Sequence, residues 1–204
     1  MTLVCPTRLD VRHLRSEISS LYSKVIEQPE SGFHFHRGPD YAAEFLGYDA
    51  SELAVLPGEA TRSFAGVGNP LKIARVRPGE TVLDIGCGAG TDLLLAAAQT
   101  GPSGKAIGVD LTTSMLACAR DSALKADFRH AEFRRGDATC LPVEDASIDV
   151  VLSNGVLNLV PEKEAALREI KRVLKPRGRV QIADIALDME LSEDARNDID
   201  LWTG

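Results

Sequence analysis

An acidic residue followed by three closely spaced glycines is the segment whose residue types best suit ligand binding. Gly86, Gly88 and Gly90 stand at every second position after Asp84, between an apolar run and a stretch rich in leucine and alanine. Because glycine has no side chain, the backbone can approach a ligand closely where a strand turns into a helix. Dinucleotide-binding proteins place the third glycine one residue later, where this sequence has Thr91. The spacing predicts a ligand loop and disfavours NAD, and a purely structural turn is the alternative.

Two further acidic residues are expected at the ends of the next two strands. Asp110 ends the run 105–110, where a carboxylate can accept hydrogen bonds from both hydroxyls of a ribose. Asp137 and Ala138 follow the run 131–135, where a carboxylate can accept from the exocyclic amine of an adenine while the backbone contacts a ring nitrogen. The carboxyl ends of parallel strands meet at one edge, so the three sites predict one nucleoside-binding crevice. For Asp110 alone, a helix cap is the alternative.

Alternating apolar runs and helical patterns must position these residues. Apolar runs predict strands at residues 81–85, 105–110, 131–135, 148–153 and 179–185. Helical spacing of apolar residues predicts helices at residues 91–99, 112–126 and 161–174. This alternation is typical of an α/β fold with a Rossmann-like, doubly wound, mostly parallel sheet.

The first 70 residues have a different texture, because prolines and glycines interrupt them repeatedly. Apolar residues at spacings of three and four predict one helix at residues 11–27, and Asp49 is a candidate N-cap of a shorter one. We therefore expect an N-terminal helical lid segment at residues 1–70 and a ligand-binding domain at residues 71–204.

Charge and composition exclude several classes of protein. The 204 residues include 23 Lys+Arg and 30 Asp+Glu, a formal net charge of -7, which is the wrong sign for binding nucleic acid. No stretch approaches the roughly 20 apolar residues of a membrane span, and no signal peptide is visible, so we expect a cytoplasmic protein without a membrane partner. The four cysteines form no C-x-x-C pair and His34 and His36 have no cysteine nearby, so we expect no metal site.

Five segments together resemble the motif series of class I S-adenosylmethionine-dependent methyltransferases, and the sequence is most similar to the arsenite methyltransferase group within them. The methyltransferase motifs lie at residues 82–90, 108–112, 136–142, 153–159 and 172–176. The resemblance to the arsenite group rests on residues 63–71, on Asn158-Leu159 with Lys163, and on residues 201–204.

The resemblance implies a role for each matching residue. Asp84 and the loop of Gly86, Cys87, Gly88 and Gly90 would support the methionine part of the cofactor, and Asp110 would hold its ribose. Leu111 and Met115 would flank the adenine, whose edge Asp137 and Ala138 would contact. Asn154 would lie beside the donor's amino-acid portion and face the acceptor pocket, and Tyr22 would close over the cofactor. These implied cofactor contacts lie at Asp84, Gly86, Cys87, Gly88, Gly90, Asp110, Leu111, Met115, Asp137, Ala138 and Asn154.

The sequence departs from the arsenite group in two respects. Arsenite methyltransferases bind trivalent arsenic through cysteine thiolates, and the two matching positions within this chain hold Val67 and Gly155, which cannot bind arsenic. Only about twenty residues follow Asp184, whereas the resemblance implies two further strands, so we expect a sheet without its last strands and with an open edge. A fragment of a longer protein, a homodimer, or the acidic segment Asp188–Asp200 folded as a helix would each account for that edge.

The sequence therefore predicts an S-adenosylmethionine-dependent methyltransferase that acts on a small-molecule acceptor. An electrophilic sulfonium needs positioning and exclusion of water more than acid or base catalysis, which agrees with the lack of an obvious catalytic dyad. A non-catalytic module that binds S-adenosylmethionine for regulation or scaffolding is an alternative. Arsenite methyltransferase is a further alternative, and an NAD-linked oxidoreductase is the least favoured.

Overall fold

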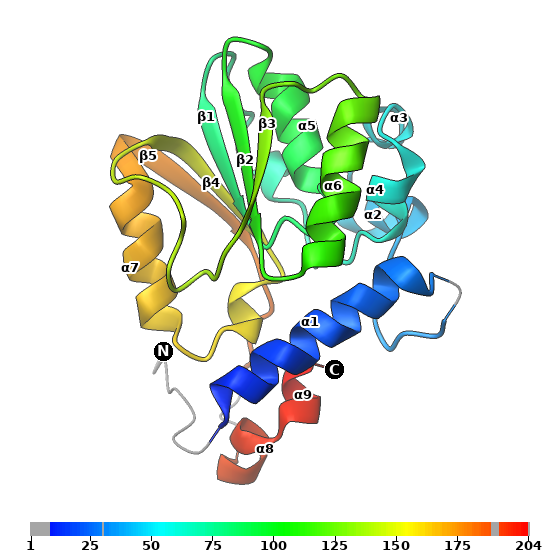
Figure 1. Ribbon diagram of the computed structural model, residues 1–204, viewed down its shortest axis with the longest axis vertical. Coiled ribbons are helices and arrows are strands. Elements are labelled where there is room, and N and C mark those ends of the chain that lie inside the picture. Colours follow the sequence, from blue (N-terminus) through cyan, green and yellow to red (C-terminus); the bar gives the residue numbers. More distant parts are fainter. Residues whose placement is uncertain (1–8, 30, 189–191, 204) are drawn as a thin grey trace.

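One five-stranded sheet forms the centre of the computed structural model, which describes residues 9–29, 31–188 and 192–203. Neighbouring strands are parallel in the order β3-β2-β1-β4-β5 (Figure 1). The strands are β1 (Thr81–Ile85), β2 (Lys105–Asp110), β3 (Ala131–Arg135), β4 (Ile148–Asn154) and β5 (Leu174–Ala183). The predicted Rossmann-like fold is therefore confirmed, and the five strands are all parallel.

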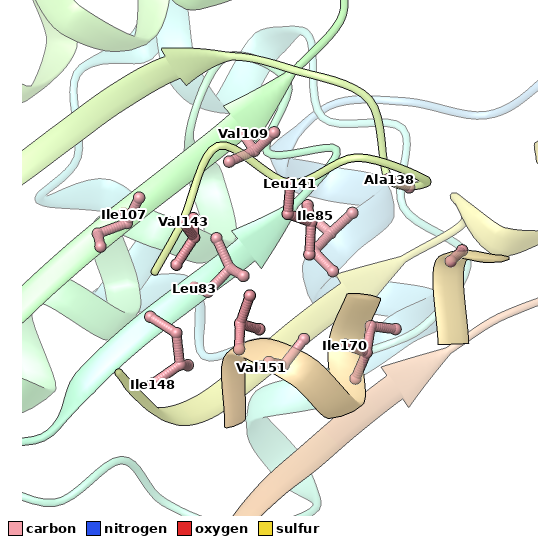
Figure 2. Close-up of a cluster of buried hydrophobic side chains, with 12 residues drawn as sticks. Leu83, Ile85, Ile107, Val109, Ala138, Leu141, Val143, Ile148, Val151 and Ile170 are labelled. Carbon is pink, nitrogen blue, oxygen red and sulfur yellow. The ribbon is translucent and has the colours of Figure 1, made fainter. Parts of the chain in front are cut away.

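Helices cover both faces of the sheet. On one face lie α5 (Thr91–Thr100) and α6 (Thr113–Lys125), and on the other lies α7 (Lys163–Val173) (Figure 1). Leu83 and Ile85 of β1 pack in a buried cluster with Ile170 of α7 (Figure 2). Val82, which precedes Leu83 and points to the opposite face of β1, packs with Ala96 of α5 in a separate cluster. A strand buried on both faces has no polar alternation, which is why β1 is a continuous apolar run.

The N-terminal helices pack on the outer side of the domain and across the end of the sheet. The helix α1 (Val11–Glu27) begins at Asp10, whose carboxylate accepts from the amides of Arg12 and His13, and it crosses the carboxyl end of the strands (Figure 1). The helices α2 (Pro39–Leu46), α3 (Ala50–Ala54) and α4 (Gly58–Arg62) share a buried cluster with α5 and α6. A single turn, η1 (Pro70–Lys72), leads toward β1. As predicted, Asp49 caps α3 through the amide of Ser51.

The chain after α7 departs from the predicted boundaries. The strand β5 begins at Leu174, five residues before the predicted start, and its pairing with β4 shifts between Ile148 and Val150. Within the irregular stretch Pro176 has no amide hydrogen and Arg177 adopts a φ of 70°, so the regular pairing is interrupted there. Regular pairing resumes at Arg179, opposite Val150.

The acidic segment near the C-terminus does not run along the edge of β5. Its helices α8 (Glu193–Asn197) and α9 (Ile199–Thr203) lie below α1, and α9 contacts both α1 and the turn η2 (Leu157–Leu159) (Figure 1). The alternative in which this acidic segment covers the sheet edge as a helix is therefore wrong for its described residues. Within the described ranges, no helix has both the length and the apolar character needed to cross a bilayer.

Candidate active site

One pocket lies where the strands β1, β2 and β4 end, beneath α1. Ten of the eleven predicted cofactor residues line it: Asp84, Gly86, Cys87, Gly88, Asp110, Leu111, Met115, Asp137, Ala138 and Asn154. The eleventh, Gly90, lies outside the lining and begins α5 with a φ of 97°. A Cβ at Gly90 would lie 3.3 Å from the Cβ of Ala119, so this glycine serves the packing of α5 against α6.

The glycine loop presents bare backbone to the pocket. Gly86 and Gly88 have φ angles of 69° and 52°, a region that side chains rarely adopt. A Cβ at Gly86 would also collide with the side chain of Val156, which lies two residues after the end of β4. The loop is therefore shaped for close approach by a ligand, as its sequence predicts.

Asp110 ties the loop after β1 to the loop after β2. One carboxylate oxygen accepts from the amide of Gly88 at 2.9 Å, and the other accepts from the amide of Thr112 at 2.7 Å. Burial raises the pKa of Asp110, although these two hydrogen bonds oppose the effect. Asp110 also lines the pocket, which places its carboxylate within reach of a bound ligand.

Asp137 contacts α1 as well as its own loop. One oxygen accepts from the amide of Thr139 at 2.8 Å, and the other lies 2.5 Å from Nε of Arg15 on α1. Burial acts to raise the pKa of Asp137, but the Thr139 hydrogen bonds and the Arg15 charge outweigh it, so the pKa is lowered. Arg15 also lies 3.4 Å from Glu162 beyond β4. The sequence analysis missed Arg15, whose contacts with Thr139 and Glu162 join residues more than 120 positions apart.

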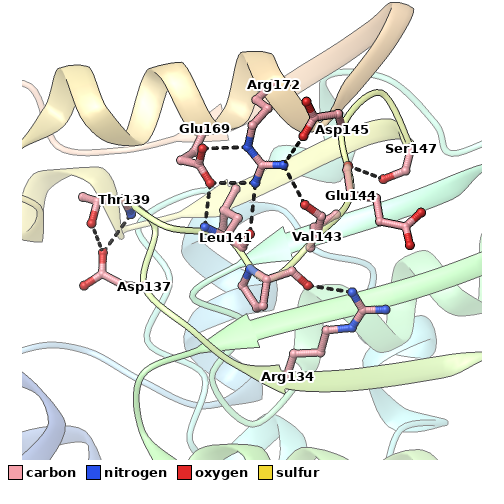
Figure 3. Close-up of polar contacts among 11 residues, drawn as sticks. Arg134, Asp137, Thr139, Leu141, Val143, Glu144, Asp145, Ser147, Glu169 and Arg172 are labelled. Carbon is pink, nitrogen blue, oxygen red and sulfur yellow. Dashed lines mark hydrogen bonds and ion pairs between the residues drawn. The ribbon is translucent and has the colours of Figure 1, made fainter.

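The loop that carries Asp137 is fastened to α7 by Arg172. Its guanidinium contacts both oxygens of Glu169 at 2.7 Å and donates to the backbone carbonyls of Leu141 and Val143 (Figure 3). It also reaches Asp145 at 2.6 Å. This set of contacts fixes the loop after β3 to α7, and it gives a structural reason for Arg172 in the motif at residues 172–176.

Tyr22 of α1 lines the pocket, where the sequence analysis expected it to close over a cofactor. Burial and the nearby charge of Asp110 raise the pKa of its phenol to about 12. Tyr22 is therefore a neutral hydrogen-bond donor at physiological pH. It also packs against Phe35 in a stacked arrangement, with ring centroids 6.1 Å apart.

Asn154 is the centre of a buried hydrogen-bond network. Its Oδ1 accepts from the amides of Val67 and Gly68, and its Nδ2 donates to Asp92 at 2.9 Å. Tyr48 donates to the other oxygen of Asp92 at 2.6 Å. Asn154 thus holds the segment 66–68 against the end of β4. Sequence reasoning missed Asp92, and the available signal was an acidic residue at the second position of an otherwise apolar helix.

Two carboxylates at the glycine loop are almost completely buried. Asp84 and Asp92 retain 2% and 6% of their accessible surface, and both line the pocket. Burial raises the pKa of Asp84 well above its usual range, and the neighbouring charges of Asp92 and Asp110 add to the effect. Burial likewise raises the pKa of Asp92 to about 6, against the hydrogen bonds from Tyr48 and Asn154. Burial also raises the pKa of Cys87, which is therefore a neutral thiol.

The two positions that match arsenic-binding cysteines are neighbours in space. A Cβ at Gly155 would lie 3.3 Å from Cγ1 of Val67. Among the described cysteines, Cys87 alone lines the pocket, while Cys118 is half-buried and Cys140 is exposed. Cys5 lies outside the described residues. The described residues therefore place an apolar contact where a pair of thiolates would be required.

The fold and pocket can be compared with known proteins. A family model described as a methyltransferase domain matches residues 77–203, which is more than half of the chain. The chain belongs to this family. Its five strands, its glycine loop and the ends of the strands that line the pocket lie within the matched range.

The named relatives of this methyltransferase domain are themselves methyltransferases. It is 46% identical over 162 residues to an arsenite methyltransferase of Halobacterium salinarum, a match that covers 79% of this chain and 41% of that protein. It is 37% identical over 114 residues to a demethylmenaquinone methyltransferase of Listeria monocytogenes, covering 56% and 48%. The crystal structure of an arsenic (III) S-adenosylmethionine methyltransferase from Chlamydomonas reinhardtii matches with a TM-score of 0.66 at 35% identity, covering 71% of this chain and 51% of that one.

These comparisons confirm the resemblance to class I S-adenosylmethionine-dependent methyltransferases close to the arsenite group. The methyltransferase domain spans less than half the length of the two curated relatives named above. Family and fold imply S-adenosylmethionine as the cofactor.

Proposed function

We propose that this methyltransferase domain binds S-adenosylmethionine in the pocket and positions its methyl group for transfer to a small acceptor. The bare backbone at Gly86 and Gly88 and the carboxylate of Asp110, all of which line the pocket, fit the methionine and ribose parts of that cofactor. When bound, S-adenosylmethionine supplies a methyl group on an electrophilic sulfonium. The single observation that carries the proposal is that ten predicted cofactor residues, from four separate segments, line one pocket.

The proposed roles of the remaining residues follow from their positions. Asp137 and Ala138 would contact the adenine edge, with Leu111 and Met115 on its faces. Tyr22 and Arg15 would hold α1 over the cofactor and exclude water, which favours a displacement at a sulfonium. In this proposal residues 1–70 form the lid and residues 71–204 the cofactor domain.

We propose a neutral, largely apolar acceptor. Beyond the cofactor residues, the pocket lining includes polar side chains such as Ser63 and Thr91 and a larger apolar wall from α1, the segment after α4 and the chain after β4: Ile18, Phe64, Val156, Leu159, Val160 and Pro161. Asn154, which has all its hydrogen-bonding groups engaged by protein, would orient the wall and leave no polar group of its own for the acceptor. An acceptor with its own nucleophilic lone pair, such as a thiol, fits this wall without a catalytic base.

Arsenite is the second candidate acceptor, because the names of two relatives specify arsenic chemistry. The contact of Val67 with Gly155 argues against it, since trivalent arsenic prefers soft thiolate ligands.

We also propose that the free edge of β5, where Val180 is 38% exposed, pairs with a second copy of the chain. A molar mass measured by light scattering would test this: a dimeric mass is expected, and a monomeric mass would contradict it.

A methyl-transfer screen tests the proposed function. The purified chain is incubated with S-adenosylmethionine and, separately, with arsenite and a series of apolar thiols, and methylated products are detected by mass spectrometry. Transfer to an apolar thiol with none to arsenite is expected. Transfer to arsenite would overturn the proposed acceptor class, and cofactor binding without transfer to any acceptor would favour a non-catalytic module.

A further inference from the structure

The carboxyl groups of Asp84 and Asp92 face one pocket from two elements. Asp84 is the last residue but one of β1, and Asp92 lies in the first turn of α5, which follows the glycine loop. Both side chains are more than nine-tenths buried. Two ionised carboxylates in one buried space repel each other, so the arrangement needs a compensating positive charge or a proton.

No protein cation supplies that charge among the described residues that line the pocket. Arg15 alone is basic there, and it is paired with Asp137 and Glu162 at the other end. The groups that face Asp92 are the Tyr48 phenol and the Asn154 amide, which are neutral donors, and Asp84. Burial and Asp92 raise the pKa of Tyr48 far above its usual value, so the phenol stays protonated.

Within the described parts of the chain, two carboxylates and one backbone donor act on the charge of Asp84. The carboxylates of Asp92 and Asp110 are the charged groups close to it, and the amide of Leu93 donates to it. The sulfur of Cys87, which also lines this end of the pocket, is a neutral thiol. The pocket therefore carries an uncompensated acidic pair at the glycine loop.

We propose that Asp92 is a second cofactor-binding carboxylate. Together with Asp84 it binds the ammonium group of the donor's amino-acid part. While the pocket is empty, Asp84 and Asp92 share one proton. This inference rests on the proposed function. When the ammonium enters, it replaces the proton as the compensating charge, and the proton passes to the solvent buffer. Tyr48 and Asn154 hold the Asp92 carboxylate in place for this exchange.

The consequence is that cofactor binding is linked to pH. A ligand that releases a proton binds more weakly as the pH falls, because the proton competes with it. The pKa of Asp92, about 6, sets the range in which the effect is largest. Between about pH 5.5 and 7 the donor's own amino group remains protonated, so a released proton in that range must come from the protein.

Isothermal titration calorimetry in two buffers with different ionisation enthalpies counts the released protons. For the wild-type chain at about pH 6 we expect on the order of one proton released with S-adenosylmethionine and with S-adenosylhomocysteine, both of which carry the ammonium. Methylthioadenosine, which lacks the amino-acid part, should release none. Binding of S-adenosylmethionine without proton release would overturn the inference alone, whereas no binding at all would contradict the proposed function as well.

Two variants separate this role from a merely structural one. Asp92→Asn should release at most half as many protons as the wild type. Tyr48→Phe keeps the ring packed on Phe64 but removes a donor to Asp92, so its proton release should persist to higher pH. Glu132→Gln is the matched control, because Glu132 lies in β3, pairs with Lys105 and is outside the pocket lining. It should behave as the wild type. Proton release that is the same in all three variants would contradict the assignment to Asp92.

Discussion

Replacement of Asp110 by asparagine tests the geometry of the cofactor pocket. The two carboxylate oxygens already accept from the amides of Gly88 and Thr112, at 2.9 and 2.7 Å. Two ribose hydroxyls would add two charge-assisted hydrogen bonds, each worth about 1 kcal/mol more than a neutral one. An asparagine must also turn its NH2 group toward one of the two amides. We expect Asp110→Asn to weaken S-adenosylmethionine binding by about 2–3 kcal/mol, or roughly 30- to 150-fold.

The assay is a calorimetric titration of folded protein at neutral pH, with circular dichroism and thermal unfolding as checks on folding. Glu132→Gln serves as the control, because this exposed carboxylate on the neighbouring strand pairs with Lys105 and Arg134 outside the pocket. Its affinity should equal that of the wild type. A folded Asp110→Asn protein that binds within threefold of the wild type would refute the assignment of the ribose to Asp110.

Three further substitutions test the lid, the glycine loop and the sheet. Arg15→Gln breaks the ion pair with Asp137, in which both side chains are less than one-third exposed. It should speed cofactor dissociation in stopped-flow experiments by about threefold to tenfold; an unchanged rate would contradict the role of α1 as a lid. Gly86→Ala should lower the free energy of unfolding by about 2 kcal/mol. Gly101→Ala should lower it by less, because Gly101 has a similar φ of 68° but no atom within 4 Å of an added Cβ. Equal losses of stability in urea denaturation would count against the collision with Val156 as the cause. Glu80→Gln should lower the free energy of unfolding by about 1–2 kcal/mol at pH 7, because the Arg179 guanidinium holds the pKa of Glu80 below its usual value. The difference from the wild type should shrink as the pH falls and the wild-type carboxylate takes up a proton; a difference that stayed constant across the acid range would contradict this cause.

The strands β1, β2 and β4 could be predicted from sequence because each is a short, largely apolar run, whereas β3, which has three charged residues in five, follows from the alternation of strands and helices. The bounds of β1, β2 and β3 match the predicted runs. The strand β5 could not be bounded in this way, because its irregular start at Pro176 and Arg177 is held by pairing with β4 rather than by a local pattern. Register shifts depend on the partner strand, which a single sequence does not specify.

The site was predictable where residues follow strands and was missed where contacts cross the chain. Asp84, Asp110 and Asp137 were found because their positions at or near strand ends can be derived from local patterns. Asp92 depends on Asn154, which lies 62 residues away, and on Tyr48, 44 residues away. No spacing rule connects such residues, and an acidic side chain within an apolar helix was the one local sign of the network.

The most direct test of the account is a parallel titration of the 204-residue chain with S-adenosylmethionine, S-adenosylhomocysteine and NAD. The glycine spacing and the lining of the pocket predict saturable one-to-one binding of the first two ligands and none of NAD. Binding of NAD, or the absence of binding by both S-adenosyl compounds in folded protein, would contradict the central claim that this pocket is a methyl-donor site.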